Sequence, residues 1–427
     1  MEESPGASTL ADDVSDHSSA PVHCSAELQP LLNSLSAGGS ISECWNTVKT
    51  WNKEKLQLAA HDTIPAVYKL LGGDYTQKGC NDLEIIQQLL GRFADVCEPK
   101  EFLLLLVEQA QESWTDCKFL VTIHAVSRCI VRIPLPRSQS VTFAVDAFAG
   151  YLETLPLPSL DNLEGHERML VDADPTVHRI CVVFPQFLDF ARPLVKKASQ
   201  NVVSKENRVG IRKEVEVLSS SLLRLLDRPL GHLDLTGRRY KRSEARYMAE
   251  ECMSLLSLLH RDFVRLVFNI RNDAEMFSNA TSQSADNSRS TQISPLNLAT
   301  FAFLAFGERV VPKCLPHVYS HQFSLEFCAP MIIDLFKEQD LFPPLHGVQF
   351  CASILSEIEP ESLSLDVLES DDLQRLALAI IKHAALARTK ELRFSMLRLL
   401  SIMSRVLDSA ARNHYFYILL KVSHYTE

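Results

Sequence analysis

The sequence predicts an all-α protein and favours a solenoid in which pairs of helices stack on their neighbours. Apolar residues recur at three- and four-residue steps, and the chain holds only 14 glycines in 427 residues, which leaves few positions for turns and phosphate-binding loops. Single hydrophobic cores stop growing at roughly 250–300 residues. The chain therefore forms either an elongated stack or, as the alternative, a pair of multi-helix globular domains.

The helical patterns divide the chain into four predicted parts. Residues 1–25 are rich in Ser, Asp, Glu and Pro, and we expect them to form a disordered tail. Residues 26–271 carry the N-terminal helical repeats. Residues 272–294 (NDAEMFSNATSQSADNSRSTQIS) are polar and are interpreted as a flexible loop. Residues 295–427 carry the C-terminal helical repeats, which begin at Pro295.

Four apolar stripes illustrate the helical period. They are Leu83, Ile86, Leu89, Leu90 and Phe93; Val215, Leu218, Leu222, Leu225 and Leu226; Met253, Leu256, Leu259 and Phe263; and Phe394, Leu397, Leu400, Met403 and Leu407. Each follows the 3.6-residue period of an amphipathic helix and not the alternation of a strand. Helix starts are indicated by Pro99 after Glu98, and by Asp371 and Asp372 before a leucine-rich run.

Charge and composition exclude several classes of partner. The net charge of −10 and the pI near 5.8 make the whole molecule a poor match for nucleic acid or an anionic membrane. The apolar runs fall short of the ~18–20 residues that span a bilayer. The 11 cysteines lie mostly in apolar runs, as Cys97, Cys129, Cys181, Cys252 and Cys351 do, where they are interpreted as small buried side chains. We predict a cytoplasmic protein that can also enter the nucleus.

The sequence offers no catalytic residues, and we predict that the protein is not an enzyme and needs no cofactor. His260-Arg261-Asp262 resembles the start of a protein-kinase catalytic loop, but Val267 stands where that loop needs its metal-binding Asn. The tripeptide is expected to continue an amphipathic helix. The GxSxG, HExxH, P-loop and GxGxxG motifs are all missing from the sequence.

Two further groups of polar residues have simple structural explanations. Cys314, His317 and His321 are spaced like soft metal ligands, but Pro316 interrupts a helix there and a fourth ligand is lacking. We therefore expect no metal site. Adjacent acids, as in Glu250-Glu251 and Asp371-Asp372, point about 100° apart on a helix and cannot share a substrate.

Two surface motifs are weighed in the same way. Arg238-Arg239-Tyr240-Lys241-Arg242 is the one dense basic run, and it suits either a nuclear-localisation element or a dock for an acidic partner. A solvated loop before the next helix is the favoured interpretation. The glycosylation pattern at Asn279–Thr281 is expected to be idle in a protein that is not secreted.

A binding function needs aromatic or arginine anchors on an exposed surface. Candidates are Trp45, Trp51, Trp114 and the run His414–Tyr417, although packing in the core is favoured for most of them. The last predicted helix, His414–Tyr425, tests whether further repeats are expected. Because the terminal repeat of a solenoid needs a polar outer face, an uncovered apolar face would indicate further repeats after Glu427.

Several stretches resemble segments of the glomulin (FKBP-associated protein) family, which is related to the plant aberrant-root-formation protein and yeast kinetochore-associated proteins. They are VCEPKEFLLLLVEQAQES (96–113), YLETLPLP (151–158), FLDFARPLVK (187–196), SPLNLATFAFLAF (294–306), 353–363 and 392–425. They occur in the order found in the family, from about residue 80 to the end.

The resemblance implies a HEAT-like or armadillo-like helical repeat protein without catalytic activity. Family members of the glomulin type bind the RING-box subunit of cullin–RING ubiquitin ligases and cover the surface that recruits the ubiquitin-conjugating enzyme. That contact lies in the C-terminal repeats of the family, and the chain ends at Glu427 before or just inside this region. The partner-binding residues thus stay unassigned. The alternative is an adaptor for an immunophilin or a receptor tail that does not inhibit a ligase.

Overall fold

A computed structural model describes residues 41–71, 80–159, 171–201, 208–236, 242–280, 293–315, 319–387 and 389–424. Helices dominate these residues, and the only extended pairing among them is an isolated parallel bridge between Leu363 and Leu407. The predicted all-α class is therefore confirmed. The predicted disordered tail, 1–25, lies outside the described residues.

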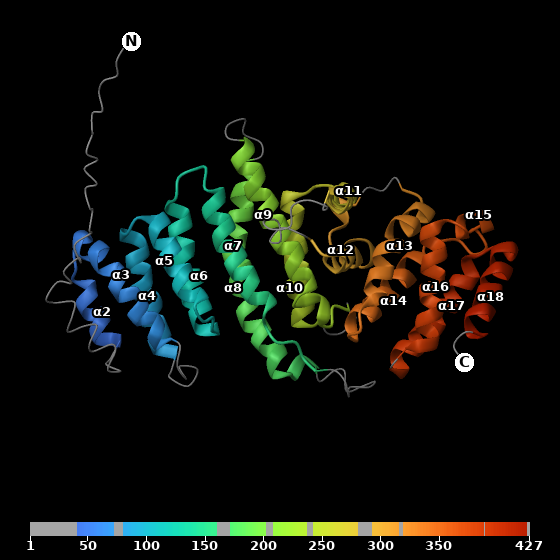
Figure 1. Cartoon of the computed structure of the whole chain (residues 1–427), viewed down its shortest axis with the longest axis horizontal. Coiled ribbons are helices and arrows are strands. Elements are labelled where there is room, and N and C mark those ends of the chain that lie inside the picture. Colours follow the sequence, from blue (N-terminus) through green and yellow to red (C-terminus); the bar gives the residue numbers. More distant parts are fainter. Residues whose placement is uncertain are drawn as a thin grey trace, which may run out of the picture.

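The helices follow one another in chain order along the long axis of the molecule, from α2 at one end to α18 at the other (Figure 1). They are α2 (Ile41–Lys49), α3 (Lys53–Leu70), α4 (Cys80–Val96), α5 (Pro99–Gln111), α6 (Asp116–Arg132), α7 (Ser138–Glu153), α8 (Pro175–Asn201), α9 (Arg208–Asp227), α10 (Glu244–Leu259), α11 (Phe263–Ala280), α12 (Pro295–Ala302), α13 (His321–Lys337), α14 (Phe342–Leu355), α15 (Leu365–Leu368), α16 (Asp371–Leu386), α17 (Lys390–Val406) and α18 (Ser409–His424).

The contacts between helices define two layers. In the first layer, α3, α5, α7, α9, α12, α13, α16 and α18 each pack on the next. In the second layer, α2, α4, α6, α8 and α10 do the same; a π-helical turn (η4, Phe303–Gly307) then contacts both α10 and α14, and α14 packs on α17. Each helix thus contacts near neighbours in the chain, and the result is an elongated arrangement.

The hydrophobic core runs between the two layers. One cluster of buried side chains extends from Ile41 in α2 to Tyr415 in α18. In α9 the predicted stripe is confirmed, because Leu218, Leu222 and Leu225 are fully buried. The predicted α4 stripe is buried in the same way, apart from the partly exposed Leu83 at its start. Broad apolar faces of this kind suit helices that are covered on two sides.

Predicted helix starts agree with the structure. Pro99 is the first residue of α5, and the carboxylate of Glu98 caps the helix by accepting a hydrogen bond from the Lys100 amide at 2.7 Å. Pro295 opens α12 after the capping residue Ser294. Both caps satisfy amide groups that have no partner inside the helix.

Two expectations about helix bounds need correction. Helix α11 continues to Ala280 and so occupies the first part of the predicted loop 272–294, whereas 281–292 lie outside the described residues. Phe263 begins α11 and does not share a helix with Met253 and Leu256.

The predicted stripe along α17 is only partly right, because its later members Met403 and Leu407 are buried but its first two are not. Phe394 and Leu397 are 72% and 53% exposed, whereas Met396 and Leu399 on a different face are buried. The helix has two apolar faces, and its neighbours α14 and α16 cover only one of them.

Among the described helices, none is both long enough and apolar enough to cross a membrane.

His232 lies in a small acidic site where the end of α9 meets the α13–α14 connection. Its Nδ1 lies 2.6 Å from Asp340 Oδ2, and its Nε2 lies 3.4 Å from Asp227 Oδ1. Burial, the largest single influence, lowers the pKa of His232, but Asp227 and Asp340 together raise it above the ordinary value. The pKa of the nearby Glu338 is raised by burial and by the same acids. The imidazole, placed between Asp227 and Asp340, therefore links the end of α9 to a distant segment of the chain.

This arrangement predicts a pH-dependent contribution to stability. A histidine whose pKa is raised in the folded state stabilises the fold fully below its unfolded pKa, and this contribution is lost as the pH rises through the folded value. Urea unfolding of wild type and His232→Gln should therefore differ more at about pH 6 than at about pH 9. His178→Gln, at an exposed position of α8, is the matched control for the loss of an imidazole. A pH-independent effect of His232→Gln would contradict the assignment.

Candidate functional site

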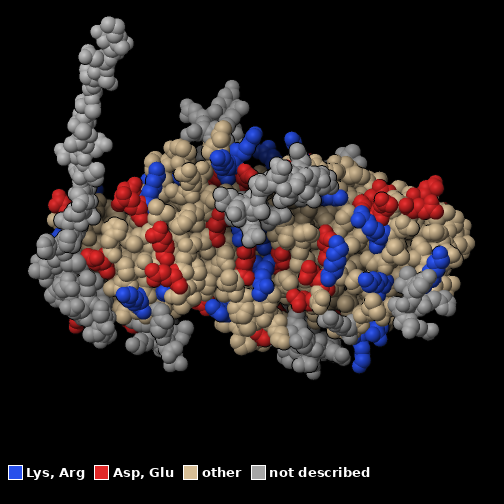
Figure 2. Space-filling model, in the orientation of Figure 1, with Lys and Arg blue, Asp and Glu red and all other residues tan. Residues whose placement is uncertain are grey.

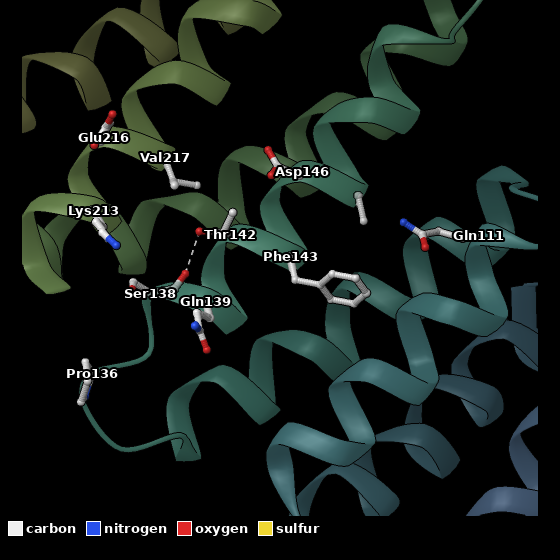
Figure 3. Close-up of a pocket in the computed structure, with 11 residues that line it drawn as sticks. Gln111, Pro136, Ser138, Gln139, Thr142, Phe143, Asp146, Lys213, Glu216 and Val217 are labelled. Carbon is white, nitrogen blue, oxygen red and sulfur yellow. Dashed lines mark hydrogen bonds between the residues drawn. The ribbon is translucent and has the colours of Figure 1, made fainter. Parts of the chain in front are cut away.

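A groove of about 830 Å³ opens on the first layer between α5, α7 and α9. Its walls come from Gln111 at the end of α5, Pro136 in the α6–α7 connection, the first half of α7, and Lys213, Glu216 and Val217 of α9 (Figure 3). A volume of this size lies in the range of sites that enclose a ligand or an anchoring part of a peptide.

Helix α7 forms the floor of the groove. Gln139, Phe143 and Asp146 are spaced at three- and four-residue steps and so lie along one side of the helix. Phe143 is partly buried, and in Figure 3 its ring extends toward α5 and Gln111. Near the start of the helix, the Thr142 hydroxyl donates a 2.8 Å hydrogen bond to the Ser138 carbonyl oxygen.

The α9 wall is anchored by a buried ion pair. Arg137 Nη2 donates to Glu214 Oε1 at 3.0 Å, and the two side chains are only 2% and 5% exposed. Arg137 Nη1 also donates to the Ile130 carbonyl oxygen at 3.1 Å. Because Glu214 points inward, Lys213 and Glu216 on the same helix are left exposed at the groove.

Two acidic side chains of α7, Asp146 at the groove and Glu153 beyond it, share the side chain of Arg224. Arg224 on α9 donates to both carboxylate oxygens of Glu153 at 2.7 and 2.8 Å, whereas it approaches Asp146 only at 3.5 Å. The pKa of the Asp146 carboxyl is raised, first by burial, while Arg224 lowers it and Glu153 raises it. Asp146 is therefore the less well neutralised carboxylate.

A smaller hollow of about 300 Å³ lies between α3 and α5. It is lined by Gln57 and His61 of α3 and by Glu98, Glu101 and Phe102 around the start of α5. Helix α5 therefore separates two hollows on the first layer. Its exposed side between them carries Glu101, Leu104 and Glu108, among others.

The structure does not gather the sequence candidates into this groove. His260, Arg261 and Asp262 form the turn between α10 and α11 and do not continue a helix, which corrects the prediction. Asp262 Oδ1 caps α11 by accepting from the Arg265 amide at 3.0 Å. His260 Nε2 lies 2.7 Å from the Ser219 hydroxyl, and burial lowers the pKa of His260. These contacts give the tripeptide a structural role.

The soft-ligand candidates are not brought together among the described residues. Cys314 Sγ points to the His260 carbonyl oxygen at 3.6 Å, His321 Nδ1 lies 3.3 Å from Glu357, and His317 lies outside the described residues. Within the described ranges, no group of three or more His, Cys, Asp or Glu side chains could hold a metal ion.

The adjacent acids have separate partners. Glu250 pairs with Arg246 at 2.9 Å and with Arg242 at 2.8 Å, whereas Glu251 pairs with Arg192 across the α8–α10 contact. This agrees with side chains that diverge on a helix. In the basic run, Arg242 alone falls within the described residues, and it takes part in this ion pair. Asn279 lies in the last turn of α11, and Thr281 is outside the described residues.

The aromatic candidates divide between core and surface. Trp51 is buried, and the half-buried Trp114 stacks on Tyr151 with ring centroids 5.2 Å apart; Trp45 is half-buried against the core. In α18, Tyr415 is buried, whereas the neighbouring Phe416 and Tyr417 are exposed together with Leu420. The last described helix therefore presents uncovered apolar side chains.

The residues of the groove were not predicted as a site. The sequence signal that could have found them is Asp146, an acid inside the otherwise apolar and small-residue run 141–150 (VTFAVDAFAG). A polar residue on an apolar helix face indicates either a buried ion pair or a binding surface.

Comparisons with models of known families and with curated proteins gave no match to this chain.

Proposed function

We propose that the chain is a non-catalytic, protein-binding scaffold of HEAT-like or armadillo-like repeats, which inhibits cullin–RING ubiquitin ligases by covering the RING-box subunit. The observation that carries the binding half of the proposal is the two-layer helical arrangement, which presents a grooved side to solvent. Extended surfaces of this kind are what stacked helical repeats use to bind other proteins.

The ordered glomulin-like segments support the ligase half of the proposal. Steric masking requires a large, rigid surface and no reactive group, because a covered RING domain cannot recruit the ubiquitin-conjugating enzyme. The scaffold would act in the cytoplasm, and in the nucleus as well if the basic run 238–242 directs import. It would need no cofactor.

The test is a pull-down of a purified cullin–RING-box complex with the chain, followed by a ubiquitin-chain assay. The proposal expects retention at micromolar concentration and slower chain formation as the scaffold is added. Absence of retention together with normal chain formation would refute ligase inhibition by this chain. Crosslinking that recovers an immunophilin or a receptor tail and no cullin would instead favour the adaptor function.

A further inference from the structure

We infer that the groove between α5, α7 and α9 binds a basic amphipathic helix of a partner protein, with an apolar side chain on Phe143 and a lysine or arginine on Asp146. This inference rests on the protein-binding half of the proposed function and is independent of the cullin–RING partner. The groove lies in the N-terminal part of the chain, far along the stack from α18 (Figure 1).

The apolar part of the groove suits an anchoring side chain. Phe143 on the floor and Val217 and Pro136 on the walls supply apolar surface, and polar groups surround them. Amphipathic helices bind in grooves of this composition by inserting apolar residues spaced three or four apart. Fixed polar groups at the rim then set the orientation of the helix.

The charges around the groove favour a cationic occupant. Asp146, Glu216 and Lys213 are the charged residues that line it, which gives a net charge of −1. At the α5 wall the exposed Glu112 directly follows the lining residue Gln111, whereas Glu98 and Glu101 line the other hollow. Figure 2 shows acidic side chains gathered over the N-terminal part of the viewed face and again at its C-terminal end, with both signs interspersed between them. An acidic peptide would be repelled.

Asp146 identifies the position of the cation. Its carboxylate shares Arg224 with Glu153, and the bidentate contact of Arg224 goes to Glu153. The three side chains together keep one negative charge in a partly buried place. A lysine or arginine of the partner would add a second, closer charge-assisted hydrogen bond to the long one from Arg224 Nη1 at 3.5 Å, and such a bond is strong where solvent is partly excluded.

The spacing on α7 sets the spacing on the partner. Phe143 and Asp146 are three residues apart on one helix, so their Cα atoms are separated by about 4.5 Å along its axis. A helical segment that aligns with α7 presents an apolar residue and a cation at this separation when they are three or four positions apart. The expected partner motif is therefore an apolar residue and a Lys or Arg at i and i+3 or i+4.

The inference is tested by fluorescence anisotropy with the full chain and a labelled helical peptide of Leu, Lys and Ala built on that spacing. Two control peptides are used: one with Glu in place of Lys, and one of the same composition with the spacing scrambled. We expect micromolar binding of the basic peptide, at least about tenfold weaker binding of both controls, and a loss of affinity as salt is raised. Equal binding of the three peptides would overturn the inference.

Matched variants locate the binding site. Asp146→Asn should weaken binding about tenfold by removing the charge-assisted contact, and Lys213→Glu should strengthen it by making the groove more acidic. Asp372→Asn is the control, because Asp372 on α16 is similarly exposed (35%, against 30% for Asp146) and also pairs with an arginine. Equal effects of Asp146→Asn and Asp372→Asn would overturn the inference, as would unchanged binding by Lys213→Glu.

The peptide-binding assay and the ligase assays, carried out on the same chain, separate this inference from ligase inhibition. A chain that binds the basic peptide but neither retains the cullin–RING-box complex nor slows ubiquitin-chain formation would refute the proposed ligase function and leave the groove assignment supported. A chain that inhibits the ligase but shows no preference for the basic peptide would refute the groove assignment and leave the proposed ligase function supported.

Discussion

Glu214→Ala is expected to lower the free energy of unfolding by about 3–5 kcal/mol. The substitution leaves the Arg137 guanidinium buried without its carboxylate, and the 2% exposure of that side chain leaves little access for water. Arg137 would keep the Ile130 carbonyl as an acceptor, which does not balance a charge. Urea unfolding followed by circular dichroism measures the effect.

A solvent-exposed ion pair of the same kind provides the control. Arg128 and Asp95 lie 2.8 Å apart, but their side chains are about half exposed, so Asp95→Ala should cost at most about 1 kcal/mol. The double substitution Arg137→Met with Glu214→Leu should recover most of the loss, because it removes both buried charges. If Glu214→Ala lowers the free energy of unfolding by no more than Asp95→Ala does, the Arg137–Glu214 pair does not stabilise the packing of α9.

Phe148→Ala is expected to cost about 3–5 kcal/mol, because it opens a cavity in the core between the layers. The fully buried ring of Phe148 contacts Phe119 of α6 and Phe190 of α8, with centroids 5.5 and 5.3 Å apart, and Trp114 at 6.2 Å. It thereby joins three successive helices of the stack. Thermal unfolding followed by circular dichroism measures the loss.

The same substitution at an exposed position gives the comparison. Phe394 on α17 is largely exposed, and Phe394→Ala should change the free energy of unfolding by no more than about 0.5 kcal/mol. A small effect at Phe148, or a large one at Phe394, would show that the core does not run where the two-layer arrangement places it.

The sequence predicts helices well where one face is strongly apolar. The α4 and α9 stripes and the start of α5 at Pro99 follow from local rules of spacing and capping. In α17 the same rules succeed only for the later members of the stripe, because the helix has apolar residues on two sides. Periodicity identifies both faces, but the neighbouring helices α14 and α16 decide which one is buried.

Prolines inside helices show a second limit of local rules. Pro185 and Pro193 both lie within α8, which continues from Pro175 to Asn201. An interior proline removes a backbone hydrogen bond and disfavours the helix by about 3 kcal/mol. The buried residues of α8, such as Phe187 and Leu194, gain enough from packing on α6 and α10 to offset it. A contribution of this kind is not visible in local sequence.

The groove depends on contacts that no short stretch of sequence encodes. Its walls come from Gln111, from residues 136–147 and from residues 213–217, and they meet because α5, α7 and α9 are successive members of one layer. The residue types predict three helices. Their juxtaposition requires the order of the stack, which single-sequence patterns do not specify.

Competition with the ubiquitin-conjugating enzyme is the most direct test of the proposed scaffold function. Binding of that enzyme to a purified cullin–RING-box complex is measured while the chain is titrated in. Steric masking predicts that the apparent affinity of the enzyme falls as the scaffold saturates the complex. Masking of the RING-box subunit by this chain would be contradicted if the scaffold binds the complex and the affinity of the conjugating enzyme stays unchanged. It would also be contradicted if the scaffold does not bind the complex at micromolar concentration.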